Sequence, residues 1–285
     1  MRKQTKDSLK LSFAIVTGIA TFSTVLGFSM KDAFPFEKMN PACAIGIRIV
    51  ILLIAFAGVS LMIWGAKSNN YKESIELNVG KNSVIIKAGD LFNENAWRII
   101  PVDACVETQA DDTIISKKSL HGKLIQKYND AEGIKKATED AAKLLGVKPQ
   151  TNGEYSFELG TAIPYFNGND RYIMVVLNKL DESYKAKTDL AQYEMTLLKM
   201  WGELRRVYAG YDISLPILGN GITEFRDKRD DTGNLIRCML CTLNTSGVCF
   251  DSKISIIINQ DDNNNLPLYE YKDIYKVVNW ETFSR

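Results

Sequence analysis

The stretch Leu215–Phe225, which reads LPILGNGITEF, contains the residues best suited to bind an anion. Gly219, Asn220 and Gly221 follow a short apolar run, and all three residue types tolerate positive φ. A loop of this kind turns successive backbone N–H groups toward one point, and glycines let a phosphate oxygen approach the main chain. A tight turn after a strand uses the same residues, so either role is consistent with the sequence.

A second candidate anion site lies at Ser119-Leu120-His121-Gly122, where the sequence predicts the start of a helix that runs to about Tyr128. Ser119 is a good N-cap, and the N–H groups of a first helical turn are free to bind an anion. His121 is the only histidine in the chain. We expect it to donate to a phosphate or to lie beside one, and we expect no catalytic residue in either segment.

The composition argues against two classes of partner. With 35 Lys and Arg against 34 Asp and Glu, the net charge of +1 gives no electrostatic bias toward nucleic acid. The five cysteines are odd in number and sparse, which fits a reducing compartment. Cys238 and Cys241 fall one turn apart on a predicted helix, and no second such pair exists. We therefore expect core cysteines rather than a metal site, and no cofactor.

Residues 1–70 are predicted to form a transmembrane hairpin. Residues 11–29 contain no charge and would span about 28 Å as a helix. The second span covers about residues 45–66, with Arg48 reaching back to the interface. Lysines and arginines flank the outer ends of both spans, which predicts a multi-pass protein of the inner membrane with cytoplasmic N- and C-termini. A cleaved signal peptide is the alternative for the first span, but that run is long and a second one follows directly.

Small residues follow one face of the first span at helical spacing, namely Ala14, Thr17, Thr21 and Thr24, with Gly18 and Gly27 nearby. In lipid such a face favours close contact between helices. The contact would lie between the two spans, between protomers of a homo-oligomer, or along a water-filled path.

Residues 71–285 alternate between strand and helix patterns, which predicts an α/β domain. The predicted strands are Ser74–Val79, Ser83–Ala88, Trp97–Val106, Tyr155–Leu159, Tyr172–Leu177, Tyr211–Leu215 and Lys253–Asn259. The predicted helices are Ser119–Tyr128, Asp130–Leu145, Asp189–Tyr208 and Asp231–Leu243. Pro101 weakens the prediction of the third strand, because proline has no N–H to donate to a neighbouring strand.

The order of these parts resembles a macro domain, a three-layer α/β domain with a mixed central sheet. The resemblance rests on Gly89-Asp90-Leu91 at a strand end, on the loop before Gly122, on Gly160-Thr161-Ala162, and above all on Pro216–Ile222. It implies that Asp90, beside Leu91, reads an adenine amino group. It also implies that Ser119–Gly122 and Gly219–Ile222 hold the diphosphate of ADP-ribose.

The segment Pro101–Thr108 departs from that family, because it lacks the Asn that acts at the distal ribose in many macro domains. The departure argues against ADP-ribosyl hydrolysis and for a modified ligand. Asp103, Glu107 and His121 are the candidate water-activating groups if the chain is nevertheless a hydrolase. No aromatic residue is obviously placed to stack on adenine, although Asn259 and Gln260 end the last strand near such a position.

Two membrane spans ahead of a divergent macro domain resemble the membrane-anchored effectors of Thoeris anti-phage defence. In that family a TIR-domain partner makes an ADP-ribose-derived signal from NAD, understood to be a histidine conjugate. The resemblance implies a non-enzymatic sensor that binds this signal, oligomerises, disrupts the lipid membrane and causes abortive infection. A membrane-tethered ADP-ribosyl hydrolase and a non-enzymatic ADP-ribose-binding anchor are the alternatives.

Overall fold

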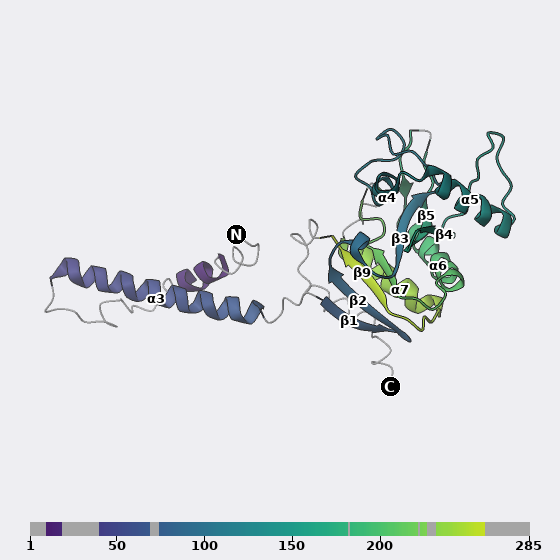
Figure 1. Cartoon of the computed structure of the whole chain (residues 1–285). Coiled ribbons are helices and arrows are strands. Elements are labelled where there is room, and N and C mark those ends of the chain that lie inside the picture. Colours follow the sequence, from purple (N-terminus) through teal and green to yellow (C-terminus); the bar gives the residue numbers. More distant parts are fainter. Residues whose placement is uncertain are drawn as a thin grey trace. The chain divides into compact units, whose positions relative to one another are not determined.

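The computed structural model describes residues 10–18, 40–68, 74–181, 183–221, 223–226 and 232–259 (Figure 1). Its contacts divide the chain into two compact units, Met1–Lys72 and Glu73–Arg285. Each unit is described by itself below.

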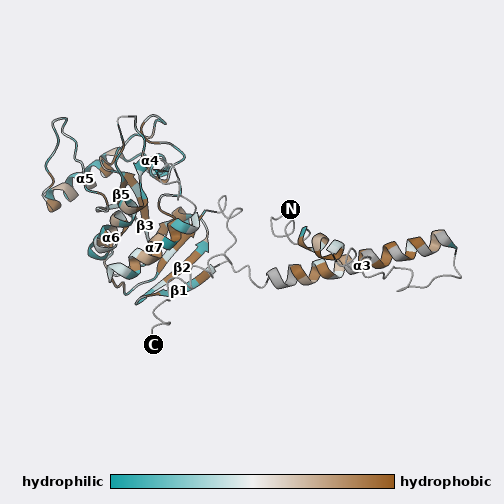
Figure 2. Ribbon diagram, turned by 180° about the vertical axis from the view of Figure 1, so that it is seen from behind, coloured by the Kyte–Doolittle hydropathy of each residue, from teal (hydrophilic) through white to brown (hydrophobic). Residues whose placement is uncertain are grey.

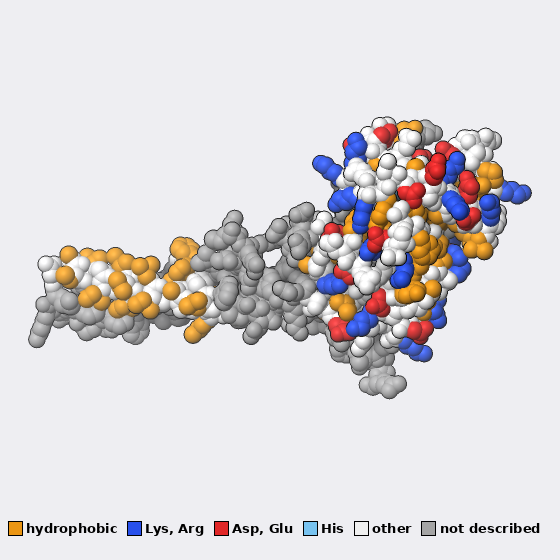
Figure 3. Space-filling view, in the orientation of Figure 1, with side chains coloured by type: hydrophobic (Ala, Val, Ile, Leu, Met, Phe, Trp, Pro, Cys, Tyr) orange, Lys and Arg blue, Asp and Glu red, His pale blue; other side chains and the backbone are white. Residues whose placement is uncertain are grey.

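In the described part of the first unit, one helix is long and apolar enough to cross a membrane. This helix, α3, covers Pro41–Ser68, and its candidate span is Ile45–Ile63. Large apolar side chains along it are exposed, such as Ile54 at 66% and Leu61 at 67%, as lipid contact would require. Figure 3 shows the described face of α3 as hydrophobic and neutral, whereas the second unit carries charges of both signs.

The predicted two-span hairpin is supported for one span only. Residues 10–18, at the start of the first predicted span, are helical, but residues 19–29 lie outside the described part of the chain. The hairpin and the multi-pass topology therefore stay predictions.

The second unit is built on a sheet with the strand order β1-β2-β9-β7-β3-β5-β4. Its strands are β1 (Ser74–Val79), β2 (Asn82–Ala88), β3 (Trp97–Asp103), β4 (Ala162–Asn167), β5 (Asp170–Asn178), β7 (Ile213–Pro216) and β9 (Ile254–Ile258). The inner strands β2, β9, β7, β3 and β5 run parallel, whereas β1 and β4 pair antiparallel at the two edges. Two short strands, β6 (Lys187–Thr188) and β8 (Glu224–Phe225), form a separate parallel pair.

Alternate residues of the parallel strands enter two separate hydrophobic cores, because successive side chains of a strand point to opposite faces. Ile99 and Ile173 pack with α6 (Leu190–Val207) and α7 (Thr232–Ser246), while Ile100 and Met174 pack with α4 (Leu120–Tyr128) and α5 (Ala131–Leu145). Figure 2 shows the hydrophobic strands lying between these helices. The predicted three-layer α/β domain with a mixed central sheet is confirmed.

Side-chain caps set the helix starts where the sequence placed them. Ser119 accepts from the Gly122 N–H, Asp130 from the Gly133 N–H and Asp189 from the Gln192 N–H. Each cap satisfies one N–H group that has no partner within the helix. Helices α4, α5 and α6 are therefore confirmed to within a residue or two.

The predicted strand Tyr155–Leu159 is wrong, since this segment is irregular. Its alternating apolar residues still pack into the core beneath α4 and α5. The alternation therefore arises from burial, and the segment does not pair with a strand. The edge strand is β4 instead, which follows directly and was missed. Pro164 lies within β4, and proline is tolerated there because an edge strand leaves alternate N–H groups unpaired. The Ala162 carbonyl accepts from Arg206 of α6.

Strand β3 parts from β7 soon after it begins. The ladder between them joins Trp97 to Ile213 and Arg98 to Ser214 and then stops, while β3 stays paired with β5 to its end. Pro101, which has no N–H to donate, lies beyond the parting. β3 ends at Asp103 rather than at Val106, which turns into the left-handed region with φ 54°.

A cluster of polar side chains joins β3 to β5 at the amino ends of the two strands. The Arg98 guanidinium donates to Asp170 at 2.7 Å and to the Tyr172 hydroxyl at 2.9 Å, and Tyr128 also donates to Asp170. The Tyr128 and Arg98 hydrogen bonds lower the pKa of Asp170. These bonds favour the carboxylate in the folded state, so they stabilise the fold at neutral pH.

We expect Asp170→Asn to lower the free energy of unfolding by about 1–2 kcal/mol at neutral pH, because it weakens hydrogen bonds to a charge that is partly open to solvent. A depressed pKa contributes stability above the unfolded pKa of about 3.9, and that contribution is lost as pH falls through the folded value. The difference from wild type should therefore shrink below about pH 4. Urea unfolding of the full-length protein measures it. The control Asp140→Asn, in an exposed pair with Lys143, should change little, and equal losses in both variants would contradict the assignment.

Candidate functional site

A cleft of about 970 Å³ opens at the carboxyl ends of the five parallel strands. Loops that follow β2, β3, β5, β7 and β9 all contribute to its walls. In open α/β sheets this edge is where ligands bind. Pro101 and Pro216 line the cleft from the two strands that part there.

Most of the residues expected at the site meet in this cleft, although they come from segments far apart in the sequence. The lining includes Asp90, Leu91, Ser119, Leu120, His121, Gly219, Asn220 and Gly221. Gly122 is not part of the lining. Ile222 lies outside the described residues.

Asp90 forms one wall together with the short helix η1 (Leu91–Asn93). Its Oδ1 accepts from the Phe92 N–H at 3.0 Å, so one carboxylate oxygen holds the turn, and the side chain is exposed at the cleft. Leu91 is buried in the core beneath α4 and α5. Phe92 is half-buried and also lines the cleft, which supplies an aromatic wall that the sequence did not reveal.

The N-terminus of α4 forms the facing wall. The Ser119 hydroxyl is committed to the fold, because it accepts from the Gly122 N–H and donates to the Ser116 carbonyl. Within the described part of the chain, the N–H groups of Leu120 and His121 have no acceptor. Helix N-termini attract anions through such free donors and through the helix dipole.

Two lysines that the sequence reading missed add positive charge to this wall. Lys118 and Lys123 both line the cleft and both are exposed. An exposed lysine beside a helix start looks like any surface lysine in sequence, so no sequence pattern marks it.

Gly122 has a packing role rather than a binding role. A Cβ at this position would lie 2.2 Å from the Ser116 carbonyl oxygen, so the turn before α4 can lie this close only against glycine. Its N–H is already taken by Ser119. Gly122 therefore helps to place the binding wall without reaching a ligand.

The loop after β7 forms the third wall, and only one of its glycines needs special backbone geometry. Gly219 has φ 81°, and a Cβ there would lie 3.3–3.4 Å from the rings of Phe225 and Tyr193. Asn220 and Gly221 tolerate positive φ as residue types but do not adopt it here. Space is open around the Cβ position of Gly221, and its place in the lining leaves the main chain accessible from the cleft.

Asp103 and His121 lie together at the inner end of the cleft, and both are buried. The Asp103 carboxylate accepts from the N–H groups of Cys105 and Glu107, and its Oδ1 lies 3.8 Å from His121 Nδ1. Burial lowers the pKa of His121 to about 4, against the opposing effects of Asp103 and of the Glu107 backbone. The imidazole is therefore neutral at pH 7.

Asn178 and Thr223 complete the cleft beside β5, and the sequence reading missed both. The Asn178 side-chain amide donates to the Thr223 hydroxyl at 3.0 Å, which joins the end of β5 to the loop after β7. A polar residue placed directly after a buried parallel strand was the available signal for Asn178. Asn259 lines the cleft as expected, whereas Gln260 lies outside the described residues.

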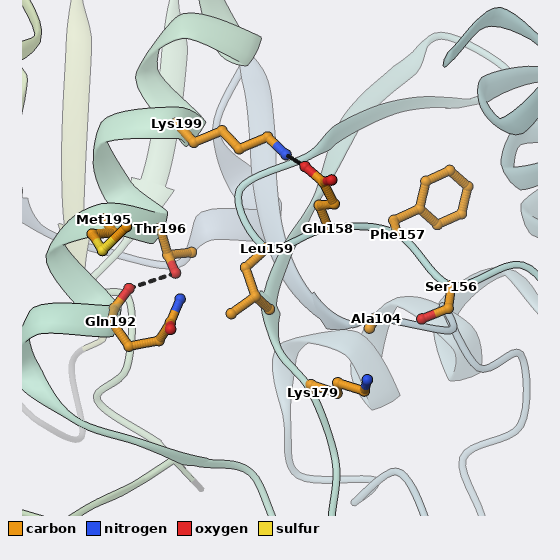
Figure 4. A pocket seen from close by; sticks show the side chains of 10 residues that line it. All are labelled: Ala104, Ser156, Phe157, Glu158, Leu159, Lys179, Gln192, Met195, Thr196 and Lys199. Carbon is orange, nitrogen blue, oxygen red and sulfur yellow. Dashed lines mark hydrogen bonds and ion pairs between the residues drawn. The ribbon is translucent and has the colours of Figure 1, made fainter. Parts of the chain in front are cut away.

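A second, smaller pocket of about 450 Å³ lies between α6 and the irregular segment Tyr155–Leu159 (Figure 4). Lys199 forms an ion pair with Glu158 across its rim, and Thr196 donates to the Gln192 carbonyl. None of the expected site residues lines it.

The cysteines are free thiols in the described part of the chain, and no group of metal-binding side chains occurs there. Cys238 and Cys241 lie on α7, as the helix pattern predicted. Burial raises the pKa of the Cys238 thiol to about 12, with a further contribution from Glu194. A thiol with such a pKa is a poor metal ligand and a poor nucleophile.

Residues 84–259 match the family described as Thoeris protein ThsA, Macro domain. The match runs from β2 to Asn259, so it takes in the cleft and more than half of the chain. The chain belongs to this macro-domain family. It is also similar to the Thoeris protein ThsA of Bacillus amyloliquefaciens (strain Y2), with 26% identity over 281 residues, 94% of this chain and 89% of the relative.

Solved macrodomains of Oceanobacillus iheyensis are similar at lower identity. A point mutant of that macrodomain gives a TM-score of 0.47 at 16% identity, covering 72% of this chain and 98% of the other. The same macrodomain with ADP gives a TM-score of 0.42 at 16% identity, covering 72% and 96%.

We expect Gly122→Ala to destabilise the macro domain by about 1–3 kcal/mol, because the added methyl group forces the Ser116–Lys117 backbone away from α4. Thermal unfolding of the full-length protein measures the loss. Gly221→Ala is the matched control, since nothing lies near its Cβ position. Equal unfolding temperatures for the two variants would contradict the packing role of Gly122.

Proposed function

We propose that the chain is a sensor–effector of Thoeris anti-phage defence whose macro domain binds an ADP-ribose-derived signal in the cleft. One observation carries the proposal. Two segments with backbone N–H groups that have no described acceptor, Leu120–His121 at the start of α4 and the loop that contains Gly219 and Gly221, line the same cleft at the carboxyl edge of the sheet. A diphosphate has two charged groups a few ångströms apart, so it suits a cleft with two anion-binding walls.

The remaining lining fits the other parts of such a ligand. Asp90 keeps one carboxylate oxygen free of described partners, and this oxygen is available to accept from an adenine amino group. Phe92 offers an aromatic face in the same cleft. Lys118 and Lys123 offset the charge of the diphosphate. The terminal group of the signal, which we take to be a histidine conjugate, would lie toward Asp103 and His121.

In this proposal the first unit is the effector. A TIR-domain partner makes the signal from NAD, the macro domain binds it, and the protein oligomerises in the inner membrane and disrupts it, which causes abortive infection. The spans at residues 11–29 and 45–66 form the hairpin, with both termini cytoplasmic. Shifting the ratio of active to inactive protein from about 1:99 to 99:1 requires the signal to bind the active state more tightly by roughly 5.5 kcal/mol. Several protomers that each bind one signal can supply this together.

A membrane-tethered ADP-ribosyl hydrolase is the second candidate, because the buried Asp103–His121 pair lines the cleft. Such an enzyme needs a base within reach of a water beside the distal ribose. Turnover of ADP-ribosyl esters by the purified protein separates the two functions. A sensor leaves these esters intact, whereas a hydrolase releases ADP-ribose.

Gly221→Glu should weaken ADP-ribose binding at least tenfold, because the side chain fills the cleft wall and repels the diphosphate. Loss of one hydrogen bond to a charged oxygen costs about 1.5–3 kcal/mol, which corresponds to that change or more. Calorimetry on the full-length protein measures the affinity. Gly202→Glu on α6, an open position away from the cleft lining, is the matched control and should bind like wild type. Equal affinity in both variants would reject this site.

Full-length protein in liposomes should release dye and grow in particle size when the products of a TIR-domain NADase are added. Replacing Gly18 and Thr21 together with Leu should leave binding intact but reduce release, because the spans can no longer approach closely. The readouts are fluorescence dequenching and light scattering in the same sample. Binding that changes neither leakage nor size would show that the protein is only an anchor.

A further inference from the structure

The cleft lining contains a buried histidine whose ring nitrogens are not fully satisfied. His121 is only 3% exposed, and neither Nδ1 nor Nε2 makes a hydrogen bond of ordinary geometry among the described residues, although the Glu107 backbone and the Asp103 carboxylate both lie close to the ring. Burying such groups without partners is costly, so in a native structure they point to something that completes them. His121 lines the cleft, so a water or a ligand in the cleft can supply a partner for the ring.

The neighbouring carboxylate is held rigidly in place. Asp103 accepts from the N–H groups of Cys105 at 2.9 Å and Glu107 at 3.2 Å, and these bonds close the turn after β3. Val106 takes φ 54° in this turn, a conformation that β-branched residues rarely adopt. The carboxylate therefore stays 3.8 Å from His121 Nδ1, close enough for an ion pair once the imidazole is protonated.

Two effects keep the imidazole neutral while the cleft is free of an anion. The ring is buried, and burial disfavours the charged form. His121 is also the second residue of α4, where the positive end of the helix dipole opposes a further positive charge. An anion bound at the N–H groups of Leu120 and His121 would offset the effect of the helix dipole and attract the imidazolium.

Other charged groups around the ring are few in the described part of the chain. Asp103 at the end of β3 lies against the ring, and Glu107 follows in the next turn. The cleft lining adds Asp90, Lys118 and Lys123, and the turn before α4 carries Asp112 and Lys117. Asp112 and Lys117 pair with each other at 3.4 Å. The positive charges of Lys118 and Lys123 oppose protonation of His121, as the helix dipole does. An anion bound beside them would remove this opposition.

We propose that the cleft takes up a proton on His121 when an anionic ligand binds, so that Asp103, His121 and the anion form one charge-paired chain. The inference rests on the proposed binding function and adds its regulation. A group whose pKa is higher in the complex than in the free protein makes binding tighter as pH falls between the two values. Affinity should rise up to tenfold per pH unit there, and stay constant above the higher value.

The test exploits the fact that His121 is the only histidine in the chain. Full-length protein labelled with ¹³C-histidine gives a single imidazole signal, whose titration is followed by NMR with and without saturating ADP-ribose. The diphosphate of this probe bears no titrating oxygen in the range where imidazole titrates. We expect the midpoint to move from about 4 to above about 5 when ADP-ribose binds.

Calorimetry in two buffers of different ionisation enthalpy counts the protons taken up below about pH 6, independently of the NMR signal. His121→Gln should abolish the uptake and flatten the pH dependence of affinity, and Asp103→Asn should reduce both. Asp140→Asn, the same charge change on the surface of α5, should behave like wild type. Binding of ADP-ribose with an unchanged imidazole midpoint and no proton uptake would overturn the coupling alone. No binding of ADP-ribose at all would reject the coupling together with ADP-ribose recognition by the proposed site.

Discussion

Pro101 has no N–H, and the ladder between β3 and β7 ends before it. A parallel sheet that stayed paired at this point would bring the two strand ends together. Because the strands part instead, the loops that follow them are held apart, and the cleft forms between them. The start of α4, which follows β3, and the loop after β7 face each other across this opening. The same proline that argues against a central strand in the sequence is thus part of what makes the site.

The sequence predicts features set by neighbouring residues, such as helix caps and glycine loops. It does not predict which distant segments meet in the cleft. Caps at Ser119 and Asp189 fix helix starts, because each acts over three or four residues. Residues of two cleft walls could be predicted because their backbone N–H groups belong to short motifs, Ser119–Gly122 and Gly219–Gly221. Tyr155–Leu159 misled because burial produces the same alternation whether or not a strand pairs. Lys118, Phe92 and Thr223 carry no local signal at all, since only the fold brings them to the cleft.

Side-chain hydrogen bonds fix several of the turns that surround the cleft. Ser119, Asp90 and Asp103 each use a side-chain oxygen to hold a turn at the edge of the cleft. A site organised in this way avoids the entropy of ordering loops when the ligand arrives. More of the binding free energy is then available to favour one arrangement of the whole protein over another. The geometry is thus suited to a receptor at least as well as to a catalyst.

The edge strand β4 limits how such a protein can assemble. Ala162 and Pro164 are two residues apart, so their outward backbone groups face the same way. Pro164 has no N–H to offer, and the Ala162 carbonyl is occupied by Arg206. A strand from another copy would find neither a donor at one position nor a free acceptor at the other. Growth by extending this edge of the sheet from chain to chain, as in amyloid, is therefore disfavoured.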